Sequence, residues 1–381
     1  MGTAAPLPFA RPTLDEDAIA AVAAVLRSGW ITSGPQVKAF ESALSAYHGG
    51  RPARVVSSAT AALEIALRLV GVGPGDEVLT PAQTFFAAPN TIARVGATPV
   101  FVDVDLATRN IDLAAAEARI TPRTRAIMPT HFGGLPVDMD ALYALAARRG
   151  LRVVEDAALA VGSSWRGRRI GSFGDICVLS FHPNKNMTTI EGGALIVATE
   201  DEARAIEVLR FHGIVRLPDG TRDVTVPGGK FNLPDVNAAV GLSQLARLDA
   251  FNARRRELVA RYFARFATEP ACLLPHRGHA GDEAGHSWNM FAPLLPLDRL
   301  TLSRKAFRDE LEARGIGTGV SYEAAHLATA YAPLGYRRGD LPNTERIADE
   351  TVTLPLFPTM TEADVDRVCA TCAEVIGAHR R

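Results

Sequence analysis

The chain has 381 residues, of which 47% are hydrophobic and 22% charged, and its formal net charge is −1. This length predicts two domains, and the charge balance argues against a surface for nucleic acid or an anionic membrane. No apolar run is long enough to span a bilayer, and the N-terminus lacks the features of a signal peptide. With four cysteines, we expect a cytoplasmic protein that binds neither nucleic acid nor membrane.

The first half of the chain is predicted to alternate between strands and helices. A Pro-rich extended segment, residues 1–13, precedes two helices at 14–27 and 36–47. This alternation predicts a mostly parallel sheet covered by helices. The strands are predicted at 54–57, 77–80, 98–102, 126–129 and 151–154, and the helices between them at 58–70, 84–95, 113–120 and 138–149.

The second half is predicted to hold the end of this sheet and a smaller α/β unit. We place the boundary along a long helix and predict a large domain over residues 1–250 and a small domain over 251–381. The predicted elements are strands at 176–181 and 194–198, a helix at 201–212, a loop at 213–229, the long helix at 234–268, strands at 288–295, 319–322 and 351–354, and helices at 303–314 and 362–378.

Cys369 and Cys372 form a C-x-x-C pair inside the last predicted helix. A zinc site would need a second pair or nearby histidines. We therefore predict helix packing for this pair and no bound metal.

Small and aromatic residues follow the first two strands of the sheet. In open α/β sheets, ligands bind beyond the carboxyl ends of strands. Ser58, Ala59 and Thr60 open a helix whose N–H groups favour a phosphate, although a simple Ser N-cap explains the same residues. Phe85 follows the second strand, where it either stacks on a flat ring or packs in the core.

Asp156 and Lys185 are the charged candidates, each just beyond a buried strand. Asp156 either caps a helix or pairs with a cation such as a protonated pyridine nitrogen. Burial would lower the pKa of Lys185 and make its amine a nucleophile that forms a Schiff base, whereas a surface hairpin would leave it charged. A phosphate site, a ring-stacking Phe, an Asp and a Lys in this order match the needs of pyridoxal 5′-phosphate.

The motifs around these residues carry a closer likeness. The sequence resembles the DegT/DnrJ/EryC1/StrS family of sugar aminotransferases over nearly its whole length, and most closely the UDP-4-amino-4-deoxy-L-arabinose–oxoglutarate aminotransferase branch. The resemblance implies a type I, aspartate aminotransferase-like fold of class α/β. The supporting stretches include Ser28-Gly-Trp-Ile-Thr-Ser-Gly-Pro, Val154-Glu-Asp-Ala-Ala, Ser180-Phe-His-Pro-Asn-Lys-Asn and Lys230-Phe-Asn-Leu-Pro-Asp-Val-Asn-Ala-Ala.

The resemblance also implies roles for individual residues. Lys185 forms the Schiff base and moves the proton, and Asp156 pairs with the pyridinium nitrogen. Asn232 reaches the cofactor of the other subunit, so the active sites of a homodimer are shared. The remaining implied contacts are Ser58, Ala59, Thr60 and Ser180 with the phosphate, Phe85 with the ring, and His182 and His326 with the sugar nucleotide.

One position departs from the family pattern. The family usually has His or Gln three residues after the aspartate, near the ring hydroxyl of the cofactor. This chain has Leu159, which cannot donate a hydrogen bond. It keeps Lys185, which relatives that became sugar dehydratases replace with histidine.

We therefore expect an aminotransferase that takes the amine of L-glutamate, leaves 2-oxoglutarate and aminates a keto group of a nucleotide-linked sugar, with a UDP-linked 4-keto sugar favoured. A dTDP- or GDP-linked keto sugar and a cyclitol ketone are alternatives. A non-catalytic binding or regulatory protein on the same scaffold is a further alternative. A Rossmann dehydrogenase is disfavoured because no G-x-G-x-x-G follows the first strand.

Overall fold

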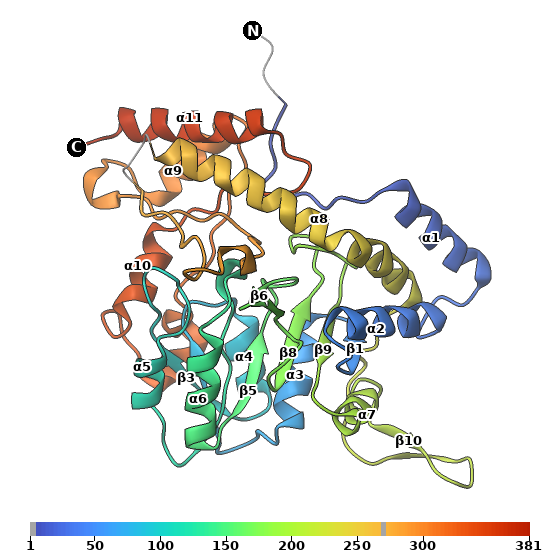
Figure 1. Cartoon of the computed structure of the whole chain (residues 1–381). Helices are drawn as coiled ribbons and strands as arrows, with labels where there is room; N and C mark the ends of the chain where they lie inside the picture. The colour runs from blue at the N-terminus through green and yellow to red at the C-terminus, as the bar shows by residue number, and fades with distance from the viewer. Residues whose placement is uncertain (1–4, 268–271) are drawn as a thin grey trace.

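A seven-stranded sheet lies at the centre of the molecule (Figure 1). The structure is a computed structural model that describes residues 5–267 and 272–381. Residues 1–4 of the predicted arm and Thr268 of the predicted long helix lie outside the described residues. In the order in which they pair, the strands are β1 (Ala53–Val56), β9 (Gly193–Ile196), β8 (Ile176–Ser180), β5 (Arg152–Asp156), β4 (Thr124–Ile127), β2 (Glu77–Pro81) and β3 (Thr98–Val102).

The sheet is mostly parallel, as the alternation of strands and helices predicts. The five strands β8, β5, β4, β2 and β3 run parallel, whereas β9 is antiparallel to both of its neighbours, β1 and β8. Asp156 pairs with Val178, so the carboxyl ends of β5 and β8 lie at one edge of the sheet. Residues that follow these two strands are thereby brought together.

Helices cover both faces of the sheet. Alternate strand residues point to opposite faces, so Val153 and Leu179 belong to one apolar cluster while Val154 and Val178 belong to another. The helices are α1 (Glu16–Ser28), α2 (Pro35–Tyr47), α3 (Ala59–Leu69), α4 (Ala87–Arg94), α5 (Leu113–Ala118), α6 (Met139–Arg149), α7 (Glu200–Leu209), α8 (Asp235–Phe266), α9 (Arg304–Ala313), α10 (Pro342–Glu350) and α11 (Glu362–Ala378).

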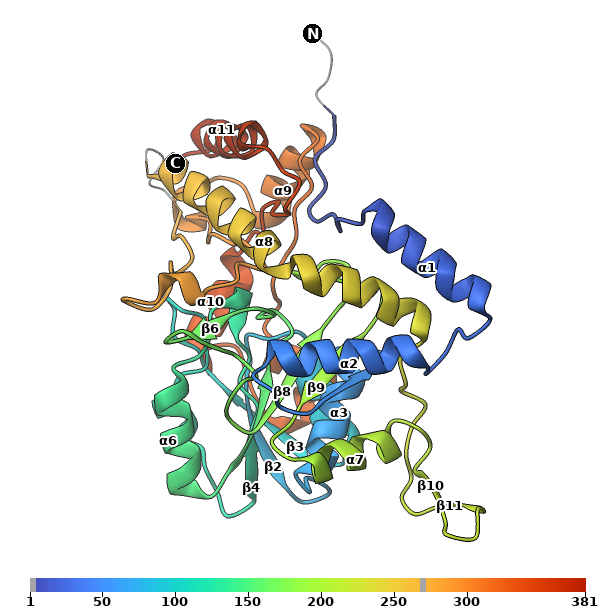
Figure 2. The same cartoon turned by 45° about the vertical axis from the view of Figure 1, so that its right-hand side comes forward.

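A separate apolar cluster holds the C-terminal part together. It joins the end of α8 to α9 and α11 and includes Cys369 and Cys372, which therefore pack inside a helix interface. Figure 2 shows α8 running from this unit toward α1 and α2. We propose the domain boundary near residue 250 of α8, a division that the separate cluster supports. None of the helices in the described part of the chain combines the length and apolar character needed to cross a bilayer.

The three strands predicted for the C-terminal unit, at 288–295, 319–322 and 351–354, are wrong as regular strands. Only isolated bridges form there, such as Phe291 with Leu354 and Gly319 with Thr353. The apolar runs are buried as expected, but the chain contacts itself one residue at a time. Burial alone therefore did not distinguish a strand from an irregular core segment.

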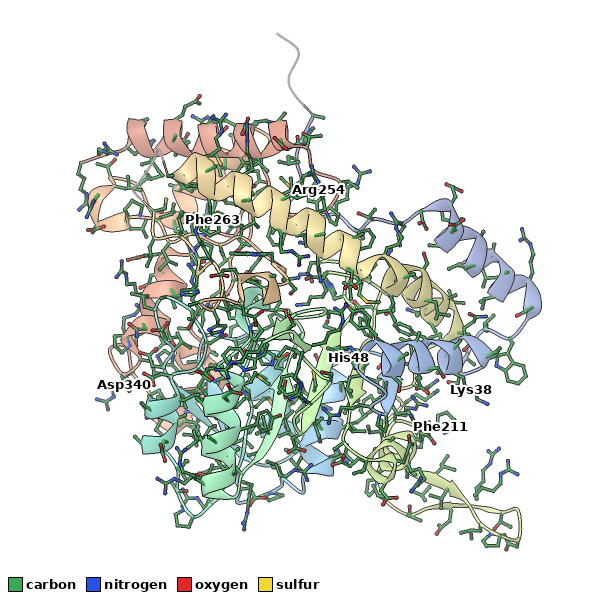
Figure 3. The ribbon with its side chains drawn as sticks, viewed as in Figure 1. Lys38, His48, Phe211, Arg254, Phe263 and Asp340 are labelled. Atoms are coloured by element: carbon green, nitrogen blue, oxygen red, sulfur yellow. The ribbon has the colours of Figure 1, made fainter. Side chains whose placement is uncertain are left out.

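The predicted loop at 213–229 contains a hairpin instead. Its strands are β10 (Ile214–Arg216) and β11 (Arg222–Val224), which pair antiparallel. The hairpin projects from the body of the molecule in both views, and Phe211 lies at its base (Figure 3).

Candidate active site

A cavity of about 200 Å³ lies at the carboxyl ends of β5 and β8, beside the start of α3. The sheet places it there because the parallel strands β5 and β8 end at the same edge. Eight of the ten predicted site residues line this cavity: Ser58, Ala59, Thr60, Phe85, Asp156, Ser180, His182 and Lys185.

The start of α3 forms a cradle for an anion. The Ser58 side chain caps the helix by accepting the Ala61 N–H at 3.1 Å, which leaves the N–H groups of Ala59 and Thr60 without helical acceptors. A Cβ on Gly193 would lie 2.5 Å from the Ala59 nitrogen, so only glycine lets β9 approach the helix this closely. The N-cap and the phosphate interpretations of Ser58 are thus compatible.

Asp156 ends β5 as a buried carboxylate, with 4% of its surface exposed. Its Oδ1 accepts the Ala158 N–H at 3.1 Å in a local turn, so the residue does not cap a helix. Burial raises its pKa, and the positive charge of Lys185 opposes that rise. A cationic donor bound in the cavity would relieve the cost of burying this carboxylate.

The neighbouring Glu155 is held away from the cavity. Its Oε1 accepts the Tyr143 hydroxyl at 2.5 Å, and its Oε2 lies 3.1 Å from His131 Nε2. His131 Nδ1 accepts the Val137 N–H, so Nε2 carries the proton that it donates to Glu155. Both oxygens of Glu155 are therefore occupied, and of the two adjacent carboxylates only Asp156 lines the cavity.

Lys185 lies in the turn after β8, and its side chain is half-buried in the cavity wall. Burial lowers its pKa from 10.5 to about 8, although the charge of Asp156 opposes the shift. A substantial fraction of the amine is therefore neutral near pH 8. The structure excludes the alternative of a lysine held out in solvent on a surface hairpin.

Asn186, which sequence reasoning missed, holds the lysine turn in place. Its Nδ2 donates to Asn252 Oδ1 at 2.6 Å and to the Ser287 carbonyl at 2.8 Å, and its Oδ1 accepts Asn289 Nδ2 at 2.9 Å. These partners come from α8 and from the C-terminal unit. A buried, fully bonded amide directly after the lysine limits how far the amine can move.

Aromatic and apolar side chains form the remaining walls. Phe85 is 57% exposed, which rules out the alternative that it packs in the core. Tyr322, also missed from the sequence, lies with its ring centroid 5.7 Å from that of Phe85. Leu159 lines the cavity in an apolar cluster with Phe132 and Met290, so it offers no hydrogen-bond donor there.

Two predicted site residues do not line the cavity. His326 is 1% exposed, and its Nε2 lies 3.2 Å from Glu345 Oε1. Asn232 forms a bridge with Val56 beside β1, and its amide donates to the Ser33 hydroxyl at 2.6 Å. Within this chain, neither residue is positioned to touch a ligand in the cavity.

His182 is exposed at the rim of the cavity, with Nδ1 2.8 Å from Asn184 Oδ1. Asn184 lines both this cavity and a second one of about 260 Å³, and Phe85 and Tyr322 also belong to both. The two spaces therefore adjoin at these three side chains.

The donors and charges of the first cavity fit pyridoxal 5′-phosphate. The anion cradle suits its phosphate, the buried carboxylate suits a protonated ring nitrogen, and the partly neutral amine suits its aldehyde. These residue types meet around a single cavity only in the folded chain. The fold and the site together define the class: a pyridoxal-phosphate-dependent aminotransferase with the type I fold.

Comparison with known proteins gives the family. The pattern of the DegT/DnrJ/EryC1/StrS aminotransferase family matches residues 12–373, and the chain belongs to this family. One similar structure is that of Spr1654 from Streptococcus pneumoniae, named as a sugar aminotransferase and solved in its PLP form. It is 32% identical with a TM-score of 0.91, and the match covers 98% of this chain and 99% of Spr1654.

Two further solved structures are similar over nearly the whole chain. DesV from S. venezuelae is 36% identical with a TM-score of 0.88, covering 97% of this chain and 98% of its own. PseC from Helicobacter pylori, an aminotransferase involved in the biosynthesis of pseudoaminic acid, is 27% identical with a TM-score of 0.91. The match covers 98% of this chain and 100% of PseC.

Proposed function

We propose that this sugar aminotransferase moves the amine of L-glutamate to a keto group of a nucleotide-linked sugar, with a UDP-linked 4-keto sugar as the favoured acceptor. The observation that carries the amine transfer is the position of Lys185 and Asp156 around one cavity with an anion cradle. When bound, pyridoxal 5′-phosphate supplies an electron sink that stabilises negative charge on the amine-bearing carbon.

The residues of the chain bind and orient the cofactor and move the proton. Ala59, Thr60, Ser58 and Ser180 would hold the phosphate, and Phe85 would cover one face of the ring. Asp156, buried and anionic, would keep the ring nitrogen protonated. Lys185 would hold the cofactor covalently at rest and carry the proton between the carbons of cofactor and substrate.

The second cavity supports a sugar as the acceptor. Its walls combine aromatic rings with amide and hydroxyl groups, including Phe9, Asn289 and Thr353. None of the described residues that line it is a lysine, arginine or histidine. A neutral, hydroxylated ring fits such a space, whereas the phosphates of a nucleotide would have to lie outside it.

We further propose a cytoplasmic homodimer with shared active sites. Asn232 lies outside the cavity of its own chain, in a bridge with Val56 at the end of β1, so any contact that it makes with a cofactor would be with that of a second copy. The four cysteines are free, which supports a reducing compartment.

The first test is an absorbance spectrum of the purified protein before and after addition of L-glutamate alone. We expect the band of the lysine-bound cofactor to convert to that of the pyridoxamine form, with one 2-oxoglutarate released per site. An unchanged band would show that the donor is wrong. The converted protein, mixed with UDP-, dTDP- and GDP-linked keto sugars and with a cyclitol ketone, then identifies the acceptor by which of them restores the first band.

Lys185→Ala should abolish turnover and leave the fold intact, as judged by circular dichroism. Lys38→Ala, at an exposed position on α2, is the matched control and should keep full activity (Figure 3). Near-normal turnover of Lys185→Ala would contradict the role of this lysine.

A further inference from the structure

A third, very small cavity lies apart from the cofactor site and is lined by Arg109, His276, His286 and Trp288. Its volume is about 20 Å³. A space of this size holds one water molecule or one ion of similar size, and it is too small for phosphate or sulfate. Phe132 and Met290 also line it, and both pack against Leu159, which lines the cofactor cavity.

Arg109 is a buried cation, and it has no acidic partner among the residues that the structure describes. It is 2% exposed, and of its five N–H donors the only contact in the described residues is from Nη1 to the Ala292 carbonyl. Its Nε is buried and has no acceptor among the same described residues. Asp105, the acid on the same turn, instead accepts the backbone N–H and the hydroxyl of Thr108. Burying an unpaired guanidinium is costly, so an anion in the cavity would stabilise the fold.

The two histidines present N–H donors rather than acceptors. His286 Nδ1 accepts the Trp288 N–H at 3.0 Å, and His276 Nδ1 accepts the Gly278 N–H at 3.3 Å. A neutral ring whose Nδ1 accepts carries its proton on Nε2. Neither Nε2 has an acceptor in the part of the chain that the structure describes. The His286 ring is further fixed by stacking on Trp288 at 3.7 Å between centroids.

The backbone is strained at two residues of this cavity. Arg109 has φ of 61° and Trp288 has φ of 50°, in a backbone region that residues other than glycine rarely adopt. Such strain persists where surrounding contacts hold it, and it gathers at binding sites. Both strained residues line the same small cavity.

We propose that this cavity binds a single monatomic anion, such as chloride, between the guanidinium of Arg109 and the Nε2–H groups of His276 and His286. No Asp or Glu is among the described residues that line it, so none of these residues offers a carboxylate that would compete for the position. Bound there, the anion joins the turn at Arg109, in the large domain, to the segment 275–292 of the C-terminal unit.

The test compares the thermal unfolding of the holoenzyme in sodium chloride and in sodium gluconate at equal ionic strength, so that charge screening is the same. We expect a midpoint about 3 °C higher in chloride, saturating with concentration. Equal midpoints in the two salts would overturn the proposal, because water alone would then satisfy the donors.

Two variants distinguish a site from a general salt effect. Arg109→Leu should remove the chloride response and leave the midpoint in gluconate unchanged or higher, because the unpaired charge is gone. Arg210→Leu removes a half-buried arginine that is paired with Glu41, and it should lower both midpoints while keeping the chloride response. A chloride response that survives in Arg109→Leu overturns the site.

A second measurement keeps the proposal open to refutation if Arg109→Leu does not fold. Crystals of the wild-type holoenzyme grown in sodium bromide should show an anomalous peak against Arg109. The absence of that peak in well-ordered crystals would overturn the site.

Discussion

At the scale of single residues, the site depends on Lys185 and Asp156, two ionisable groups whose pKa values are shifted by burial. Burial lowers the pKa of Lys185 and raises that of Asp156, while each charge opposes the shift of the other. The two side chains therefore suit a cofactor that would bond covalently to Lys185 and pair with Asp156.

The shift at Lys185 predicts a pH dependence for the cofactor-free protein. The fraction of neutral amine rises with pH and reaches one half near pH 8, so labelling by an aldehyde and borohydride should rise to that pH and then level off. Mass mapping of the peptides measures it, with exposed Lys38 as the reference for the reagent. A labelling midpoint near 10.5 would contradict the prediction.

The same shift sets the sign of a stability effect. Between about pH 8 and 10.5 the unfolded lysine keeps its proton while the folded one has lost it. The stability contributed by this group therefore rises with pH across that window, and below about pH 8 the full cost of the buried charge is present.

Asp156→Asn should separate catalysis from folding. The amide cannot keep a ring nitrogen protonated, so turnover should fall by about 10²-fold or more. The thermal midpoint of the cofactor-free protein should be unchanged or higher, because a buried carboxylate has been removed. A loss of activity that merely follows a loss of stability would mean that Asp156 is structural.

At the scale of elements, the close approach of β9 to the start of α3 builds the phosphate cradle. Ser58 caps α3, and Gly193 lets the backbone of β9 lie against the N–H groups of the first turn. The strand after the lysine turn and the helix after the first strand thus meet, although the contacting residues Ala59 and Gly193 lie 193 − 59 = 134 positions apart in the sequence.

Gly193→Ala should weaken the cradle. Its methyl group would lie 2.5 Å from the Ala59 nitrogen, and pushing β9 away should cost about 1–3 kcal/mol and reduce the affinity for pyridoxal 5′-phosphate. Gly73→Ala, where an added Cβ meets no atom within 4 Å, is the control and should change neither. Equal cofactor affinity in both variants would show that the approach of β9 does not form the phosphate site.

At the scale of the whole molecule, the proposed homodimer makes a prediction of its own. Lys185→Ala and Asn232→Ala should each be inactive, since each lacks one half of every shared site. Unfolding and refolding an equimolar mixture should restore about a quarter of the wild-type activity, because half of the dimers are mixed and one of their two sites is intact. Activity that stays at the level of the single variants would contradict the sharing of sites.

Much of the site could be predicted from the sequence because its groups sit in local motifs at strand ends. Ser58, Asp156 and Lys185 each follow an apolar strand, and the geometry of parallel sheets brings such positions to one edge. Phe85 was predicted in the same way, from its position after the second strand, and its exposure removed the alternative of core packing.

The rest could not be predicted because it depends on contacts between distant segments. Tyr322 and the Asn186 network join the cavity to the C-terminal unit, and no local pattern marks either as part of a site. The predictions of strands at 288–295, 319–322 and 351–354 were wrong for a related reason. An apolar run indicates that a segment is buried, but it does not indicate whether that segment pairs with a neighbouring strand.

The sequence by itself determined the alternation of strands and helices, the order of the cofactor-binding residues and the family. These properties follow from hydrophobic periodicity and short motifs, which neighbouring residues carry. Only the tertiary structure decided that β9 runs antiparallel, that His326 is buried against Glu345 and that Arg109 lies beside two histidines with no acidic partner in the described part of the chain. Such outcomes depend on which distant surfaces pack together, because burial and electrostatic cost are properties of the folded chain rather than of any one segment.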